Sequence, residues 1–213
     1  MSGVLVRDRR AERRQATIDE ILAAAWELVR EEGVAALSVR GLGTRVGMRA
    51  QSLYVYFPSK HAIYDAMFAQ ANTELLRRLQ DGPEPGDPIT SLHRRARAFV
   101  EFCTEDPARY QLLFQRTIPG FEPSPEAYAP AVRFLANTQE LLALNGVTEA
   151  RHLDLWTALI TGLVDQQVSN DPGGDRWTGL IDESIDMFLA HCQQHHAKRK
   201  PSSRPNRTKG PRS

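Results

Sequence analysis

Apolar residues recur at the spacing of α-helices through most of this chain, and stretches rich in glycine and proline interrupt them. The first periodic segment begins at Thr17, which forms a T-x-x-E capping box with Glu20, and it ends at Gly33. Its inward positions are Ile18, Ile21, Leu22, Ala25, Leu28 and Val29. The segment predicts a first helix that buries one face in a core.

A shorter helix is expected over residues 38–46, followed by Gly47. Its inward positions are Val39, Leu42 and Val46. Because glycine lacks a Cβ, Gly47 can adopt the positive φ that a tight turn between helices requires. A third helix begins at Met48 and ends before Pro58, since proline disfavours helical geometry in the residue before it. This is the pattern of a helix-turn-helix, whose second helix enters the major groove of DNA.

The exposed side of the third helix carries chemistry suited to DNA. Gln51 can pair bidentately with adenine, Ser52 can bond several base edges, and Ala50 can touch a thymine methyl group. The hydroxyls of Tyr54 and Tyr56 can donate to phosphate oxygens. We therefore expect this helix both to read bases and to hold the phosphate backbone.

A fourth, long helix is expected from Ser59 to Leu79, and Ser59 can cap its first turn. Lys60 stands at its N-terminal end, where free N–H groups and the ammonium both attract phosphate. Its apolar face holds Ile63, Met67, Ala71 and Leu75. The following stretch, residues 81–88, is a turn-rich linker that no helix can cross, and it is the expected boundary between two domains.

Five further helices are expected beyond the linker, which gives nine helices, no convincing strand and an all-α fold. They cover residues 90–105, 107–115, 127–144, 149–169 and 176–194. Proline-rich residues 117–125 and the turn at residues 170–174 separate some of them. Trp177 and Leu180 are expected on the inner face of the last helix.

The segment from Leu53 to Lys60, LYVYFPSK, resembles the signature of TetR-family transcriptional regulators. The resemblance extends to residues 17–25, 32–33, 38–40 and 46–47 and so covers the N-terminal part of the chain. It implies an all-helical homodimer with an N-terminal three-helix DNA-binding domain and a C-terminal ligand-binding and dimerisation domain. The DNA-contacting positions that it implies are Ser38, Arg40, Arg49, Ala50, Gln51, Ser52, Tyr54, Tyr56 and Lys60. Thr17 is a further candidate for phosphate contact, with helix capping alone as the alternative.

One position departs from the pattern of the family. Gly43 stands where the family usually has alanine, and Gly41 is a second glycine in the same helix. Each glycine costs about 0.5 to 1 kcal/mol of helix stability. We therefore predict that this helix is loose in the absence of DNA.

Charge is distributed unevenly along the chain. The first 60 residues hold ten lysines and arginines against seven acids, residues 61–194 hold ten against nineteen, and residues 195–213 hold seven against none. Basic ends and an acidic middle suit a protein that meets a polyanion at one end and keeps its body away from it.

These patterns divide the chain into four parts: a basic disordered arm (1–14), a helix-turn-helix domain (15–60), a helical ligand-binding and dimerisation domain (61–194) and a basic disordered tail (195–213). The arm can follow the DNA backbone or reach a minor groove, or it is a solvated leader. The tail can add non-specific DNA affinity, or it is a solubilising end. No apolar segment follows the arginines of the arm, so it is not a secretory signal, and we expect a cytoplasmic location.

Two roles compete for the apolar faces beyond the linker. The last two helices can pair with their symmetry mates in a four-helix bundle, and the four helices before the last can enclose a pocket. Eight aromatic residues are candidate pocket walls, with ordinary core packing as the alternative for each: Phe99, Phe102, Tyr110, Phe114, Phe121, Tyr128, Phe134 and Trp156. Such a pocket favours a mostly apolar ligand oriented by a few polar groups.

No set of acid, base or nucleophile residues converges in the sequence, and no nucleotide-binding glycine motif follows a strand, so we expect no enzyme and no cofactor. Cys103 and Cys192 fit no metal spacing and no disulfide framework, which predicts two buried apolar cysteines, with a redox switch as the alternative. The histidines at 191, 195 and 196 do not predict a metal site. No apolar run approaches the roughly 18 residues of a membrane span.

The function expected from the sequence is that of a ligand-responsive transcriptional regulator. It would act as a repressor that binds double-stranded DNA at a palindromic operator as a homodimer, and a small, mostly apolar effector would release it. The alternative is an all-helical small-molecule binding or scaffold protein without specific DNA binding.

Overall fold

The structure is a computed structural model that describes residues 9–81 and 86–199, with side chains described as far as Gln194. These residues form nine α-helices and two short 3₁₀ helices, and none of them is in a strand. The elements are α1 (Arg9–Glu32), η1 (Val34–Ala36), α2 (Val39–Arg45), α3 (Ala50–Leu53), α4 (Lys60–Gln80), α5 (Pro88–Glu105), α6 (Pro107–Phe114), α7 (Pro125–Leu144), α8 (Ala150–Asn170), η2 (Thr178–Leu180) and α9 (Ile181–Arg199). The all-α expectation is confirmed.

Helix α1 begins earlier than the sequence pattern predicts. It starts at Arg9, so the described part of the predicted arm, residues 9–14, is helical. Thr17 therefore lies within the helix and does not cap it, and its hydroxyl donates to the carbonyl of Arg13 at 3.0 Å. Side chains that favour helices, such as arginine, glutamate and alanine, fill these positions, and Gln15 bonds Asp19 one turn later at 2.8 Å.

The end of the chain differs from the prediction in two respects. Helix α9 continues to Arg199, five residues into the predicted tail, and the rest of that tail lies outside the described residues. The predicted start at residue 176 is also wrong, because a 3₁₀ turn comes first and α9 begins at Ile181. Leu180 ends that turn with 40% of its surface exposed, so it does not lie on an inner face.

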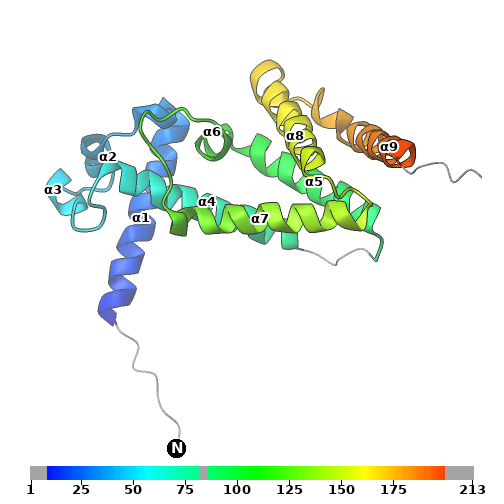
Figure 1. Cartoon of the computed structure of the whole chain (residues 1–213). Coiled ribbons are helices and arrows are strands. Elements are labelled where there is room, and N and C mark those ends of the chain that lie inside the picture. Colours follow the sequence, from blue (N-terminus) through cyan, green and yellow to red (C-terminus); the bar gives the residue numbers. More distant parts are fainter. Residues whose placement is uncertain (1–8, 82–85, 200–213) are drawn as a thin grey trace, which may run out of the picture.

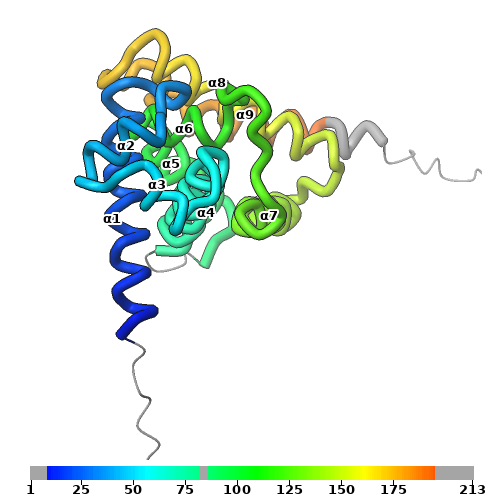
Figure 2. The backbone as a smooth tube through the Cα atoms, turned by 90° about the vertical axis from the view of Figure 1, so that its left-hand side faces the viewer, coloured from blue at the N-terminus to red at the C-terminus, as the bar shows by residue number. Residues whose placement is uncertain are grey.

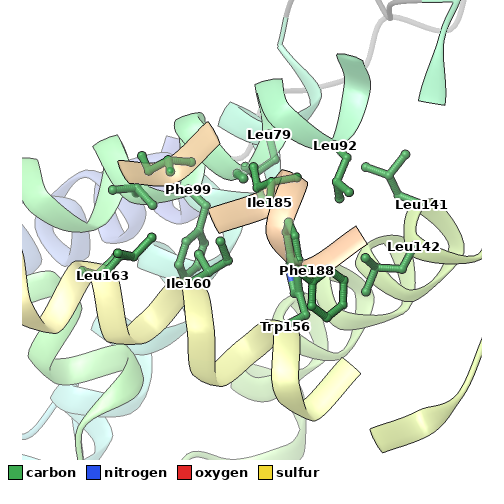
Figure 3. Packing of buried hydrophobic residues seen from close by; sticks show 14 of the residues in the cluster. Leu79, Leu92, Phe99, Leu141, Leu142, Trp156, Ile160, Leu163, Ile185 and Phe188 are labelled. Atoms are coloured by element: carbon green, nitrogen blue, oxygen red, sulfur yellow. The ribbon is translucent and has the colours of Figure 1, made fainter. Parts of the chain in front are cut away.

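The described helices surround two hydrophobic cores. The first joins α1, α2, α3 and the first half of α4, and includes Ile21, Leu42, Leu53 and Met67. The second joins the end of α4 to α5, α7, α8 and α9, and Figure 3 shows part of it. In that core Phe188 of α9 packs against Trp156 of α8, with ring centroids 5.4 Å apart.

The linker at residues 81–88 does not separate the two cores as expected. Leu79 before it and Leu92 after it belong to the same core. The other core instead receives Ala108 and Leu112 from α6, which lies much further along the chain. The two cores therefore meet along α4 and α6, and α4 runs from one to the other beside α7 (Figures 1 and 2). No helix of the described residues is long and apolar enough to cross a membrane.

A buried carboxylate ties the end of α1 to the start of α6. Asp106 is 6% exposed, and its side chain caps α6 by accepting from the Arg109 backbone N–H at 3.2 Å. The same carboxylate accepts from Arg30 in the last turn of α1, at 2.9 Å from Nε and 2.8 Å from Nη2. A buried carboxylate is tolerated only with such partners, so this pair links the two cores.

We predict that Asp106→Ala lowers the free energy of unfolding by about 2 to 3 kcal/mol, because it removes a helix cap and leaves the Arg30 guanidinium without its partner. The matched control is Glu74→Ala, which removes a surface pair with Arg77 in which the glutamate side chain is 45% exposed. That change should stay within about 0.5 kcal/mol. Urea unfolding followed by circular dichroism measures the change in the free energy of unfolding for both variants. Equal changes would show that the Asp106 contacts do not stabilise the packing of α1 against α6.

Candidate nucleic-acid interface and internal cavity

Helices α2 and α3 form as the sequence predicts, with a tight turn between them. Ser38 caps α2, because its hydroxyl oxygen accepts from the Gly41 N–H at 3.1 Å. Gly47 has a φ of 67°, which confirms the positive φ expected at the turn. Helix α3 is shorter than expected and ends at Leu53, so Tyr54 and Tyr56 lie in the turn that follows it.

Gly43 lies close to the backbone of the turn that joins the two helices. Its carbonyl accepts from the Met48 N–H at 2.8 Å, and a Cβ built on Gly43 would lie only 2.7 Å from the Met48 carbonyl oxygen. Position 43 therefore requires glycine for its small size, because even a methyl group would force the backbone to shift. The looseness of this helix without DNA stays a prediction.

The residues predicted to contact DNA lie on α1, α2, α3, the turn after α3 and the start of α4. Ser38, Arg40, Arg49, Gln51 and Tyr54 are exposed, whereas Thr17, Ala50, Ser52, Tyr56 and Lys60 are half-buried. Leu53 is completely buried and anchors α3 to the first core. Helices α2 and α3 project together at one end of the molecule (Figure 1).

Arg14 joins this surface although the sequence pattern placed it in a disordered arm. Its guanidinium lies 5.5 Å from the centre of the Tyr56 ring and 3.4 Å from the Val55 carbonyl oxygen. Thr17 is one turn further along α1 on the same side. The cluster of arginines in residues 7–14 was the available sequence signal, but only the helical start of α1 places one of them beside the α3 turn.

The start of α4 is fixed against the 3₁₀ turn η1. The Lys60 ammonium lies 3.4 Å from the Ala35 carbonyl oxygen and 5.5 Å from the centre of the Tyr64 ring. The Tyr64 hydroxyl donates to the Val34 carbonyl at 2.6 Å, and burial raises the pKa of Tyr64 to about 12. Tyr64 therefore stays protonated and keeps this donor at every physiological pH.

Charged side chains also tie α2 to α1. Arg45 forms two hydrogen bonds to the Glu31 carboxylate, at 2.8 and 2.6 Å. The hydrogen bond from Arg45 lowers the pKa of Glu31, so the carboxylate stays ionised. Arg45 consequently acts as a link between helices, and Arg40 and Arg49 are exposed on this surface.

A partly open cavity of about 240 Å³ lies between α4, α5, α6, α7 and α8. Five of the eight aromatic residues predicted as pocket walls line it: Phe99, Phe114, Tyr128, Phe134 and Trp156. The Phe99 and Phe134 rings stack with centroids 5.7 Å apart, and Phe114 meets Phe99 edge-on at 5.4 Å. The wall is thus formed largely by aromatic and aliphatic side chains, as in known ligand pockets.

Three of the predicted wall residues lie elsewhere. Phe102 is completely buried beneath the Arg109 guanidinium, which is 4.3 Å from the ring centre. Tyr110 is buried, and its hydroxyl donates to the Thr161 carbonyl at 3.4 Å. Phe121 packs against α4 next to the first core. Helical spacing does not specify which neighbour covers an aromatic residue such as Tyr110, and it does not apply to Phe121, which lies in the proline-rich stretch 117–125.

Helix α4 supplies a wall of the cavity that the sequence analysis missed. Its contributions are Phe68, Asn72, Leu76, Leu79 and Gln80. The available signal was Phe68 and Leu76, which widen the apolar face beyond the predicted stripe. One helix therefore begins at the candidate DNA surface and ends as a wall of the cavity (Figure 1).

Aromatic contacts connect this cavity to the start of α4. Phe68 and Tyr128, both at the cavity wall, stack with ring centroids 6.1 Å apart. Phe121 lies against Phe68 at 6.4 Å and against Tyr64 at 5.6 Å. The first turn of α7 is also bound to α4, because the Ser124 N–H and hydroxyl both donate to the Asp65 carboxylate, at 2.6 and 2.7 Å.

The cysteines are small buried residues, as predicted. Cys103 is completely buried and Cys192 is 4% exposed, and neither is in a disulfide. Burial raises the pKa of both thiols, which keeps them protonated and unreactive. The described residues contain no group of three side chains that could hold a metal, and the side chains of His195 and His196 lie outside them.

Comparisons with known proteins identify both the DNA-binding motif and the fold. Residues 21–67 match the family model described as bacterial regulatory proteins of the tetR family. A comparison with curated protein sequences gives no match.

Three solved structures share the fold. A TetR-family transcriptional regulator, PfmR from Thermus thermophilus, is 23% identical with a TM-score of 0.61, over 81% of this chain and 98% of its own. A TetR-family transcription regulator from Marinobacter aquaeolei is 18% identical with a TM-score of 0.65, over 84% and 97%. A TetR variant from Acinetobacter baumannii in complex with minocycline is 22% identical with a TM-score of 0.56, over 83% and 96%.

We predict that Gly43→Ala destabilises the protein by about 1 to 3 kcal/mol, because the added methyl group would meet the Met48 carbonyl oxygen and displace the turn between α2 and α3. Gly41→Ala in the same helix is the control. There the nearest atom is the rotatable Ser38 hydroxyl, so the gain in helix propensity offsets weaker capping, and the change stays below about 1 kcal/mol. Thermal unfolding measures the two variants, and an equal or larger loss for Gly41→Ala would contradict the close approach at Gly43.

Proposed function

Since the chain belongs to the TetR family of bacterial regulatory proteins, we propose that it is a repressor that binds a palindromic operator as a homodimer. Members of this family are DNA-binding transcription factors and not enzymes. A small, mostly apolar effector in the α4–α8 cavity releases it from DNA. The observation that carries this proposal is the position of α4, which follows the helix-turn-helix at one end and walls the cavity at the other. In this proposal residues 15–60 bind DNA, and residues 61–194 bind the effector and dimerise.

DNA recognition divides into positioning and base reading. Lys60 at the first turn of α4 and the Tyr54 hydroxyl are suited to phosphate oxygens, while exposed Gln51 is suited to an adenine edge. Arg14 adds a cation beside the same turn. The other predicted contact residues, namely Thr17, Ser38, Arg40, Arg49, Ala50, Ser52 and Tyr56, complete the proposed surface.

Release follows from a shift between two conformations. An effector that fits the cavity better in one position of α4 favours that position, and the shift is limited to its difference in affinity for the two states. Phe68 and Tyr128 are at the cavity wall, and Phe121 links them to Tyr64 near the start of α4. A movement there changes the separation of the two α3 helices in the dimer, and the half-sites of the operator then no longer fit.

The dimer forms through α8 and α9, which expose apolar and small side chains. On α8 these are Leu155, Ala158 and Gly162, spaced at three and four residues, and on α9 they are Met187 and Ala190. Such a face suits an isologous contact with a second copy. Next to this exposed face, a flank of α9 is held to α5, where the Arg97 guanidinium and then His93 bind Asp182 and lower its pKa.

The proposed function is tested by fluorescence anisotropy of the purified protein with the DNA upstream of its own gene, beside a scrambled duplex of equal length, over a salt series. Saturable binding with a clear preference for the upstream DNA is expected. Equal binding to both duplexes that vanishes with salt would show only non-specific attraction, and it would favour the alternative of a helical scaffold or small-molecule binding protein.

We predict different consequences for the positioning and the reading residues. Lys60→Ala and Tyr54→Phe should weaken binding to all sequences by a similar factor, and the lysine change should reduce the salt dependence, since each removes a phosphate contact. Gln51→Ala should instead lower the preference for the operator by about 1 to 3 kcal/mol. Competition titrations against operators with single base changes measure this, and identical profiles for all three variants would contradict the division.

We predict that Met187→Glu converts the dimer to a monomer, because it places a charge on a face that the partner would bury. Met187 is 60% exposed, so the fold of the single chain should survive. Val132→Glu on α7 is the control, because Val132 is 53% exposed and lies outside the proposed interface. Light scattering after size-exclusion chromatography gives the mass of each variant, and a dimeric Met187→Glu protein would exclude this interface.

A further inference from the structure

The cavity contains a single charged wall residue, and this limits the chemistry of its ligand. Among the described residues that line it, Arg95 is the only one with a charge, and no carboxylate lines it. Arginine remains protonated at any physiological pH and presents several donors in a planar arrangement. A half-buried guanidinium in a mostly apolar cavity without a carboxylate favours a ligand that brings one negative charge.

Several other polar side chains of the wall use their donors within their own helices. Each threonine of the wall donates to a carbonyl one turn earlier in its own helix. The bonds are Thr138 to Phe134 at 3.0 Å, Thr157 to Leu153 at 2.9 Å and Thr161 to Thr157 at 2.7 Å. The Asn72 amide donates to the Phe68 carbonyl at 3.0 Å. Besides the Tyr128 hydroxyl, the other polar side chains of the wall are Gln80, Arg95 and Asn137. A guanidinium carries five N–H donors, so Arg95 can bond a ligand in addition to its contacts within the protein.

Gln80, Arg95 and Asn137 share one end of the cavity. Helices α4 and α7 lie side by side in the same direction, since Asp65 contacts Ser124 and Phe68 contacts Tyr128 (Figure 2). Gln80 is therefore level with the last third of α7, near Asn137. Phe68 stands 12 residues before Gln80, which is about 18 Å along a helix. The cavity is thus long, with amide and guanidinium groups at one end and the Phe68–Tyr128 stack at the other.

The polar end of the cavity also leads toward the surface. A second hollow of about 220 Å³ shares Arg95, Asn137 and Leu141 with the cavity. Glu140 lines this outer hollow but not the cavity, and it is exposed, so water screens its charge. A charged head group held at Arg95 would keep part of its hydration, which lowers the cost of binding it.

We propose that the effector is an elongated apolar molecule with one acidic head group, such as a carboxylate or a phosphate. Its head binds Arg95, with Asn137 and Gln80 beside it, and its apolar chain extends along α4 and α7 toward Phe68 and Tyr128. This inference rests on the proposed function, because it specifies the ligand of the effector cavity. The far end of the chain then meets the aromatic contacts that lead to the start of α4.

Isothermal titration calorimetry of the full-length protein tests this class with three probes of equal length: decanoate, decanol and decylammonium. Decanoate should bind at least about tenfold more tightly than decanol, because a charge-assisted hydrogen bond to arginine is worth that factor or more. Decylammonium should bind more weakly than decanol. Hexanoate should bind more weakly than decanoate, since it leaves part of the apolar wall uncovered.

Variants of the arginine separate the head-group contact from simple apolar filling. Arg95→Gln should reduce decanoate affinity about tenfold and leave decanol affinity unchanged, whereas Arg95→Lys should retain most of the preference for decanoate. The matched control is Arg133→Gln, which removes an exposed arginine of α7 that does not line the cavity. It should change neither affinity. Circular dichroism confirms that each variant is folded, and the probe series on the unaltered protein stands even if one variant is not.

Equal affinity for decanoate and decanol, or a preference that survives Arg95→Gln, would overturn the proposal. Absence of binding by all three probes would overturn it as well. None of these three outcomes contradicts the proposed DNA binding, because operator preference in the anisotropy titration is measured without any ligand. If the operator is bound and decanoate also releases it, while decanol at the same concentration does not, the proposal and the function are supported together.

Discussion

Helix α4 belongs to two hydrophobic cores at once, and the remaining structure depends on this constraint. Ile63 and Met67 of its first half are buried with α1, α2 and α3, while Leu75 and Leu79 of its second half are buried with α5, α8 and α9. Because close-packed cores resist small displacements, a change at either end of the helix must be accommodated at the other. A continuous helix of 21 residues therefore runs from the candidate DNA surface to the cavity, and in the proposed function it couples the two.

Two further contacts restrict how the cores can move relative to each other. Asp106 holds the last turn of α1 to the start of α6, and Asp65 holds the start of α7 to α4. Both are carboxylates whose oxygens accept hydrogen bonds from another element, so each would lose its partners if the helices separated. In the proposed function, movement about these two points, with the Phe68, Tyr128 and Phe121 rings between them, carries the effect of a bound effector to α3.

The helix-turn-helix and the cavity differ in how strictly their residues are specified. At Gly43 the Met48 carbonyl of the turn leaves no space for a methyl group, and at Gly47 the turn requires a positive φ. The cavity instead has a broad apolar wall in which only Gln80, Arg95 and Asn137 gather polar groups at one end. Such a wall accepts many apolar shapes, so discrimination between ligands falls on the few polar groups that touch them.

The sequence by itself determined the all-α fold, most of the helix boundaries and the helix-turn-helix, because local signals encode them. Ser59 as a cap and Gly47 as a turn act within a few residues of their own positions, and the LYVYFPSK segment carries the family resemblance. Tertiary structure decided what depends on contacts between distant segments. Packing placed Phe121, from a proline-rich stretch, against α4 and placed Phe134 of α7 at the cavity, and it brought Ala108 and Leu112 of α6 into the first core. Periodicity shows that a side chain faces inward, but only the arrangement of helices shows what it meets there.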